Sequence, residues 1–370
     1  PVAASTARRW VDALRAGDVD KVASSSAIPF KAGTEVVAKT NEQLKAMLTQ
    51  LAEDAAGMQH FGLEDLPYAG EVGDIGPDGQ LRVSVVEAPT ASGGGARRPA
   101  SPLPRAPISG LTEQSPNGLL PIVASNGRTP SQAYARPFTP QQGRPMLAVV
   151  VGGLGFNARA TTQAIDELPA EITLSFVPYA DNLQSWIDRA RAAGHEVLLE
   201  LPMEPFDPDA DDTGPQTLLA SATAQQNVTR LEFLLARATG YFGVTNYQGA
   251  RFATSAQASQ PIVQQLRRRG LAFISTGIGQ RTALNVEAQR AGMPTAAADR
   301  IIDVRREADA IDDQLLNLEA LALQNQSAIG AGFAYPVTIE QVGRWAADVE
   351  SRGYQLAPAS AVLTARAARR

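Results

Sequence analysis

The chain has 370 residues, 33 Lys and Arg against 38 Asp and Glu, a formal net charge of −5, two His and no Cys. The lack of cysteine excludes disulfides, thiolate zinc sites, iron–sulfur clusters and a thiol nucleophile. We interpret the arginine clusters at 267–269 and at Arg366, Arg369 and Arg370 as solvated helix ends, so no basic surface for nucleic acid is expected. No apolar run approaches the roughly 20 residues that span a bilayer, so no membrane span is expected either.

The composition is 44% hydrophobic, which suffices for one large domain with a smaller module beside it. The chain begins at Pro1 and not at a methionine, which suits a mature form whose N-terminal leader has been removed.

Residues 1–87 have the pattern of a small α+β module. Apolar residues at helical spacing occur around Trp10 and around Leu44, and β-branched residues cluster at 34–38 and 80–86. Residues 88–145 contain eleven of the 25 prolines and keep no regular period, which is typical of a linker. The apolar stretches 119–123 and 134–138 are expected to dock this linker on a neighbouring domain.

From Met146 to Leu363 short apolar runs alternate with amphipathic helical stretches, and a basic tail follows at 364–370. The predicted strands lie at 147–151, 172–177, 196–199, 242–244, 271–274, 301–304 and 327–329. The predicted helices lie at 183–193, 228–238, 257–269, 309–324 and 338–352. Repeated strand–helix–strand units require parallel pairing, which leaves a β/α barrel or a doubly wound open sheet. In both folds ligands bind at the carboxyl ends of the strands.

Glycines follow the first of these strands. Gly153, Gly155 and Ala158 fit the spacing of a dinucleotide-binding loop, although no acidic residue ends the next strand, and a tight turn is the simpler interpretation. His195 follows a glycine that ends a helix, so we expect it at the opposite end of its strand from the site, in a structural role.

Polar residues follow two later strands. Glu200 and Glu204 lie at or beyond the end of the third strand and could serve as acid or base, or form surface salt bridges. Asn246, Tyr247 and Arg251 follow the fourth strand, where they could face a ligand or satisfy the carbonyls of their own loop.

Several motifs resemble the divergent polysaccharide deacetylase family. They are Leu198-Leu199-Glu200-Leu201-Pro202-Met203-Glu204-Pro205, Gly214-Pro215-Gln216-Thr217-Leu218-Leu219 and Gly243-Val244-Thr245-Asn246-Tyr247-Gln248-Gly249-Ala250-Arg251-Phe252, with 173–179 and 192–196. The resemblance spans roughly 146–363 and implies a NodB-like (β/α)7 barrel related to metal-dependent carbohydrate esterases. In active relatives an Asp pair and later histidines hold a divalent metal that activates water.

Carried onto this chain, the resemblance implies that the metal ligands have been replaced. Gly152 and Gly153 stand at the Asp pair, Glu200 and Tyr247 at two histidines, Ser275 at an aspartate and Phe333 at the late histidine. Only Glu200 could still ligate, so no metal and no other cofactor is expected. The groove is expected to persist, with polar contacts to a ligand from Glu200, Asn246, Tyr247, Arg251 and Ser275, and with sugar-stacking faces from Tyr179, Phe206 or Trp186, the last being more simply a packing residue.

Three functional hypotheses follow, and whether the chain is an enzyme stays open. The first is a periplasmic or cell-envelope pseudoenzyme that binds a carbohydrate or peptidoglycan fragment. The second is a weak metal-independent carbohydrate hydrolase in which Glu200 or Glu204 is the base, Tyr247 the acid and Arg251 the oxyanion partner. The third is an envelope interaction module that recruits a protein partner through 88–145.

Overall fold

The computed structural model describes residues 30–32, 35–38, 71–75, 81–84, 101–207, 212–277 and 281–369. Contacts divide the chain into two units, Pro1–Arg97 and Arg98–Arg370, with the division inside the predicted linker. Among the described residues no helix is long and apolar enough to cross a membrane.

In its described residues the first unit has two antiparallel strand pairs. β1 (Phe30–Ala32) pairs with β2 (Glu35–Ala38), and β3 (Glu71–Ile75) pairs with β4 (Leu81–Ser84). Strands at 34–38 and 80–86 are therefore confirmed, while the helices expected around Trp10 and Leu44 lie outside the described residues.

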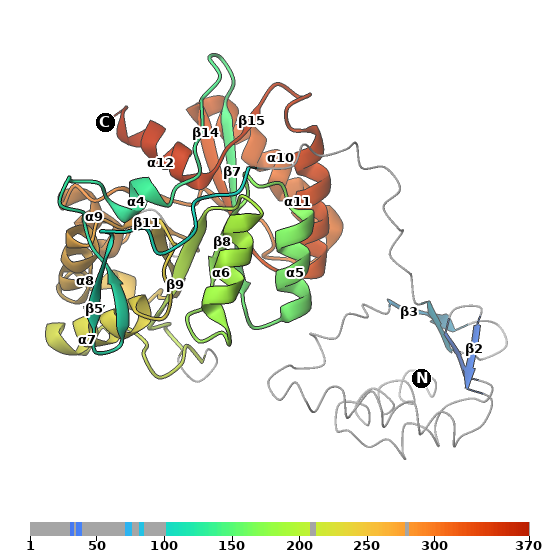
Figure 1. Cartoon of the computed structure of the whole chain (residues 1–370). Coiled ribbons are helices and arrows are strands. Elements are labelled where there is room, and N and C mark those ends of the chain that lie inside the picture. Colours follow the sequence, from blue (N-terminus) through green and yellow to red (C-terminus); the bar gives the residue numbers. More distant parts are fainter. Residues whose placement is uncertain are drawn as a thin grey trace. The chain divides into compact units, whose positions relative to one another are not determined.

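The second unit is built on one parallel sheet with the strand order β12-β11-β10-β9-β8-β7-β14-β13, and β15 also pairs with β7. These strands are β7 (Met146–Leu154), β8 (Thr173–Phe176), β9 (Val197–Met203), β10 (Gly243–Gln248), β11 (Ala272–Ser275), β12 (Thr295–Ala297), β13 (Arg300–Ile301), β14 (Ser327–Phe333) and β15 (Gln355–Leu356). The sheet curls and helices surround it (Figure 1). This is the NodB-like α/β architecture that the resemblance implied.

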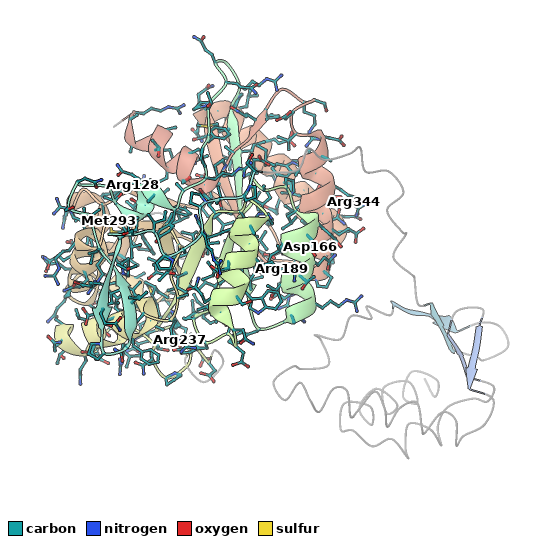
Figure 2. The ribbon with its side chains drawn as sticks, viewed as in Figure 1. Arg128, Asp166, Arg189, Arg237, Met293 and Arg344 are labelled. Carbon is teal, nitrogen blue, oxygen red and sulfur yellow. The ribbon has the colours of Figure 1, made fainter. Side chains whose placement is uncertain are left out.

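Helices α5 to α11 cover the outer face of the sheet. They are α5 (Ala158–Glu167), α6 (Leu183–Ala192), α7 (Ala224–Leu235), α8 (Ala256–Arg268), α9 (Ala283–Arg290), α10 (Ala308–Asn325) and α11 (Pro336–Asp348), and α12 (Ala359–Ala367) follows them. Side-chain caps fix several starts: Asn157, Thr223, Ser255 and Thr282 each accept a hydrogen bond from the first helical turn. Figure 2 shows Arg189 of α6 pointing toward Asp166 of α5, 2.7 Å away.

Alternation along each strand separates two apolar layers. Val149 and Val151 of β7 belong to the cluster that packs under the helices, while Ala148 and Val150 belong to an inner cluster with Leu198, Ile274 and Ile329. Ala359 and Val362 of α12 join the inner cluster. The inside of the curled sheet is therefore a packed core, and only its ends are available for a ligand.

Residues 101–145 lie against this sheet. They form the hairpin β5 (Thr112–Ser115) and β6 (Gly118–Pro121) and the short helix α4 (Pro130–Ala133). Leu120 and Tyr134, one from each expected docking stretch, are buried. The buried guanidinium of Arg191 donates to the carbonyls of Pro104, Tyr134 and Gly240 at 2.9 to 3.2 Å, and so fastens this segment to the barrel.

Two of the arginines interpreted as solvated are not solvated, and that part of the prediction is wrong. Arg269 forms ion pairs at 2.9 Å with Glu113 and with Glu232. Arg366 belongs to α12, and its guanidinium contacts Asp299, Ser327 and the Ala297 carbonyl. Composition shows the charge of an arginine but not the carbonyls and carboxylates that the fold brings around it.

Candidate functional site

Glu200 is the central polar group of the barrel mouth, by which we mean the carboxyl ends of β7 to β14. Its Oε1 accepts hydrogen bonds from the Gly153 amide at 2.7 Å and the Ser175 hydroxyl at 2.8 Å. Its Oε2 is buried and has no hydrogen-bond partner among the described residues. Burial raises the pKa of Glu200 to about 7, against the lowering effect of the two hydrogen bonds. At neutral pH this carboxyl can therefore give or take a proton.

The carboxyl of Glu200 also fills the space beside Gly152. A Cβ at position 152 would lie 2.8 Å from Glu200 Oε1 and 2.8 Å from Ser175 Oγ. Real carbon atoms do not approach oxygen so closely without displacing it. A side chain on β7 at this position and the observed Glu200 conformation therefore exclude each other.

Aromatic rings form a second part of the mouth. Phe333 ends β14 with 39% of its surface exposed, and it meets Tyr247 of β10 edge to face at 6.5 Å between ring centroids. Phe333 also lies 6.1 Å from the Tyr335 ring, over which the Arg306 guanidinium stacks at 4.0 Å. Such rings can cover the C–H face of a sugar.

Asp303 positions this aromatic group, and no sequence motif singled it out. Its Oδ2 accepts hydrogen bonds from the Phe333 amide at 2.6 Å and the Thr338 hydroxyl at 3.0 Å. Burial raises the pKa of Asp303, against these bonds. The available signal was an acidic residue inside the otherwise apolar predicted strand 301–304.

Glu204 and Arg251 hold the edge of the mouth together. Glu204 Oε2 accepts from the Ala220 amide at 2.6 Å, and Oε1 lies 3.5 Å from Arg251 Nε. The Glu204 carbonyl also accepts from the amides of Arg251 and Phe252. The salt-bridge alternative for Glu204 is thus the arrangement that the structure has.

Asn246 and Ser275 lie near the ends of the neighbouring strands β10 and β11. Within the part of the chain that the structure describes, the Asn246 side chain is fully hydrogen-bonded, whereas the Ser275 hydroxyl is not. The Asn246 side chain bonds the amide and carbonyl of Thr276 at 2.8 Å and the Gln248 carbonyl at 2.7 Å, so it stabilises its own loop. Ser275 Oγ is buried without a partner among the described residues. Ile274 belongs to the inner cluster, so by alternation Ser275 faces the helix layer and not Glu200.

The three aromatic residues expected to stack on sugar differ in exposure. The Tyr179 hydroxyl accepts from the Gln216 amide at 2.9 Å, and its ring lies against Gly214. Trp186 packs on the helix-facing core, beside Arg189. Phe206 is 67% exposed and is the one of these three rings whose faces solvent reaches most freely.

The remaining motifs are used inside the fold. The Gly153 amide is bound to Glu200 and the Gly155 amide to Thr161 Oγ1 at 2.9 Å, so the glycine loop does not present these amides to a phosphate. The ring nitrogens of buried His195 lie 2.8 Å from the Ile172 carbonyl and 3.2 Å from that of Ile165. Burial lowers the pKa of His195, and its contacts are those of a core residue.

Comparison with known proteins agrees with the strand-end motifs. The model of the divergent polysaccharide deacetylase family matches residues 149–363. The chain belongs to this family. A crystal structure of an uncharacterized protein from Agrobacterium tumefaciens C58 is 36% identical, with a TM-score of 0.64, and the match covers 66% of this chain and 99% of that one.

Two curated relatives match about half of the chain. The uncharacterized protein YibQ of Escherichia coli K12 is 25% identical over 194 residues, and the match spans 52% of this chain but only 60% of YibQ. An uncharacterized protein of Haemophilus influenzae is 24% identical over 195 residues, covering 52% of this chain and 68% of its own length.

The residues at the mouth do not fit the divalent metal that the resemblance implied. Among the described residues no three His, Cys, Asp or Glu side chains lie close enough together to hold a metal ion. Glu200 is the one carboxylate at the replaced positions, and its Oε1 is already bound to Gly153 and Ser175. A hard cation needs several oxygen ligands, which glycine, phenylalanine and a single carboxylate do not supply.

Proposed function

We propose that this protein binds a carbohydrate, such as a peptidoglycan fragment, at the barrel mouth and does not carry out metal-dependent deacetylation. The observation that carries the proposal is the position of the Glu200 carboxyl. It lies 2.8 Å from where a side chain at Gly152 would begin, in the part of the site where the resemblance places a metal-binding aspartate.

The remaining groups suit a polar ligand with apolar faces. Glu200 Oε2 is buried without a partner among the described residues, so a ligand hydroxyl or acetamido N–H would bond it by displacing the groups that cover it. Phe333 presents an exposed ring at the same end of the sheet, because it is paired with Gly152 in the register of β14 and β7. A hydrogen bond to a polar atom and an exposed aromatic ring are the usual elements of sugar recognition.

Two measurements on the purified protein test this proposal. After the protein is loaded with zinc and dialysed against zinc-free buffer, we expect it to retain less than one equivalent of zinc per chain. We also expect no acetate release from chito-oligosaccharides. In calorimetric titration with chitotetraose, Phe333→Ala should weaken binding about fivefold, because an aromatic contact contributes about 1 kcal/mol. Leu316→Ala, which removes an exposed apolar side chain from α10, is the matched control and should bind normally.

Stoichiometric zinc together with acetate release would refute the proposal. Equal binding by the wild type and Phe333→Ala would place the sugar elsewhere on the molecule.

The raised pKa of Glu200 favours a second candidate, a metal-independent hydrolase. A buried carboxyl with a pKa of about 7 is suited to general acid–base work at neutral pH. In that case Glu200→Gln should abolish turnover of a carbohydrate ester or amide while binding persists. Turnover that survives Glu200→Gln would remove this candidate.

We further propose the cell envelope as the location and the 88–145 segment as the place to search for a protein partner. In its described part, 101–145, this segment carries exposed Val123 and the β5–β6 hairpin on the barrel surface. Fractionation of cells and pull-down with a variant lacking the hairpin test these two points.

A further inference from the structure

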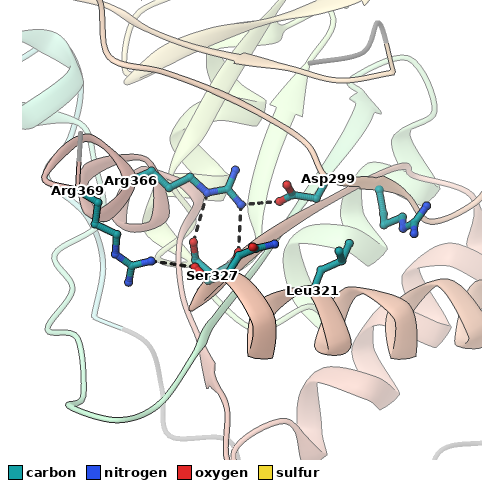
Figure 3. A pocket seen from close by; sticks show the side chains of 7 residues that line it. Asp299, Leu321, Ser327, Arg366 and Arg369 are labelled. Carbon is teal, nitrogen blue, oxygen red and sulfur yellow. Dashed lines mark hydrogen bonds and ion pairs between the residues drawn. The ribbon is translucent and has the colours of Figure 1, made fainter. Parts of the chain in front are cut away.

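A polar pocket lies at the opposite end of the sheet from the barrel mouth. It has a volume of about 580 Å³ and is lined by Asp299, Arg300, Ser327, Arg366 and Arg369, among others (Figure 3). Ser327 begins β14 and Phe333 ends it, so the pocket and the mouth are separated by roughly 20 Å of strand. The pocket is therefore distinct from the site described above.

The pocket adjoins the seam where the two end strands of the curled sheet meet. β12 and β13 are the two end strands of the sheet order, and only residues 298 and 299 separate them. The Arg366 side chain spans this seam by bonding Asp299, the Ala297 carbonyl and Ser327. The two end strands are not paired with each other in the sheet order, and the Arg366–Asp299 ion pair lies between them.

The charge around this pocket is positive although the chain as a whole is acidic. Three arginines and one aspartate line it, and Asp299 is neutralised by Arg366. Arg369 uses Nη1 to bond the Asn325 carbonyl at 2.8 Å, while the Arg300 side chain is exposed and has no partner among the described residues. Two guanidinium groups therefore keep donors that can reach a ligand.

A buried hydroxyl on the other side of the ion pair gives an independent indication. Asp299 and Arg366 also line a smaller pocket of about 100 Å³, together with Thr295. The Thr295 side chain is 7% exposed, and its Oγ1 has no hydrogen-bond partner among the described residues. A buried polar atom without a partner is costly, so its presence here marks the seam as a place that accommodates polar ligand groups.

We propose that this seam pocket binds a small anion with two or more negative charges on phosphate or carboxylate groups, held chiefly by Arg300 and Arg369. Guanidinium groups bond both kinds of group in a two-pronged geometry and keep their charge at all relevant pH values. The volume fits a small molecule and not a polymer. The binding does not depend on carbohydrate at the barrel mouth.

Calorimetric titration of the full chain with sodium pyrophosphate and, separately, with citrate tests this. We expect saturable binding of at least one anion, and a preference between the two would assign the phosphate or the carboxylate group. Arg300→Gln and Arg369→Gln should each weaken binding about tenfold, since each removes a charge-assisted contact. Arg159→Gln, an exposed arginine of α5, removes the same charge elsewhere and should leave binding unchanged.

A second measurement needs no variant. Pyrophosphate or citrate, whichever binds, should protect Arg300 and Arg369 from modification by phenylglyoxal, as read by mass spectrometry, and should not protect Arg159. Failure of both anions to bind saturably would overturn the proposal. Equal weakening by Arg159→Gln, or equal protection of Arg159, would also overturn it, because the attraction would then be general to the surface.

Discussion

The carboxyl of Glu200 on β9 and the backbone of Gly152 on β7 touch across β8, with Oε1 2.8 Å from where a Cβ at 152 would be. The Gly153 amide and the Ser175 hydroxyl complete the surroundings of that oxygen. The identity of residue 152 is thereby coupled to that of residue 200, and the coupling can be measured.

Gly152→Ala should destabilise the protein by about 1–3 kcal/mol, because the added carbon overpacks a filled site. Combining it with Glu200→Ala should cost less than the sum of the two single changes, which a double-mutant cycle in urea measures. Gly343→Ala in α11 is the control: its Cβ would come no closer than 4.0 Å to Leu168, so it should stabilise by about 0.5–1 kcal/mol. Additive effects at 152 and 200 would show that the two side chains do not compete.

Glu200 should make the folding stability depend on pH. Its pKa is about 7 in the folded protein against a reference value of 4.5, so the folded state holds the proton more tightly. This stabilisation is complete below pH 4.5 and is lost as the pH rises through 7; the difference is about 3 kcal/mol. Urea unfolding of the wild type and of Glu200→Gln between pH 5 and 8 measures this contribution to the free energy of unfolding. Only the wild type should lose it as the pH rises. If the free energies of unfolding of the wild type and Glu200→Gln change in parallel with pH, other groups cause the pH dependence.

Arg191 should hold the 101–136 region on the barrel. Burial lowers its pKa to about 10, so it stays charged at neutral pH, and carbonyls of Pro104, Tyr134 and Gly240 accept its hydrogen bonds. Arg191→Met leaves these carbonyls without a donor and should cost at least about 2 kcal/mol. Hydrogen exchange should rise first in 101–136. Arg189→Met, which removes an exposed ion pair with Asp166, should change stability by less than about 1 kcal/mol.

Substitution by alanine should cost much more stability at Asn246 of β10 than at Ser275 of β11. Asn246→Ala removes hydrogen bonds to both backbone groups of Thr276 and should cost about 2–3 kcal/mol. Ser275→Ala deletes a buried hydroxyl that has no partner among the described residues, and should change stability by less than about 1 kcal/mol. Thermal unfolding of both variants distinguishes them, and a large loss for Ser275→Ala would indicate a partner for its hydroxyl.

The strands of four or more residues in the parallel sheet were predictable, whereas β12 and β15 were not, and the predicted strand 301–304 overlaps β13 (Arg300–Ile301) at one residue. β7, β9 and β14 each extend a predicted run, because β-branched and small apolar residues there are buried on both faces. β12 and β15 have three and two residues, too few to show a period. Pairing with neighbours, not local sequence, makes these segments regular.

For the site, the sequence identified which residues stand at the mouth but not how they are used. Glu204 and Asn246 were correctly placed at strand ends, yet their side chains bond neighbouring loops. Asp303 was passed over although it positions the Phe333 backbone. Which of several polar residues faces a ligand depends on contacts between residues 16 to 47 positions apart, as between Glu204 and Ala220 or Gly153 and Glu200.

The order of apolar runs and amphipathic helices by itself determined a parallel α/β sheet, because each crossover must return the chain to the same end of the sheet, and it left a barrel and an open sheet as alternatives. The sequence also determined that Gly152, Gly153 and Phe333 bring no metal ligand, since that follows from side-chain composition alone. Only the tertiary structure decided that Glu200 is buried against Gly152 and that Arg366 bonds Ala297 of β12 and Ser327 of β14 across the end of the sheet. Burial, pKa and pairing are properties of a side chain's surroundings, and those surroundings come from residues distant in the chain.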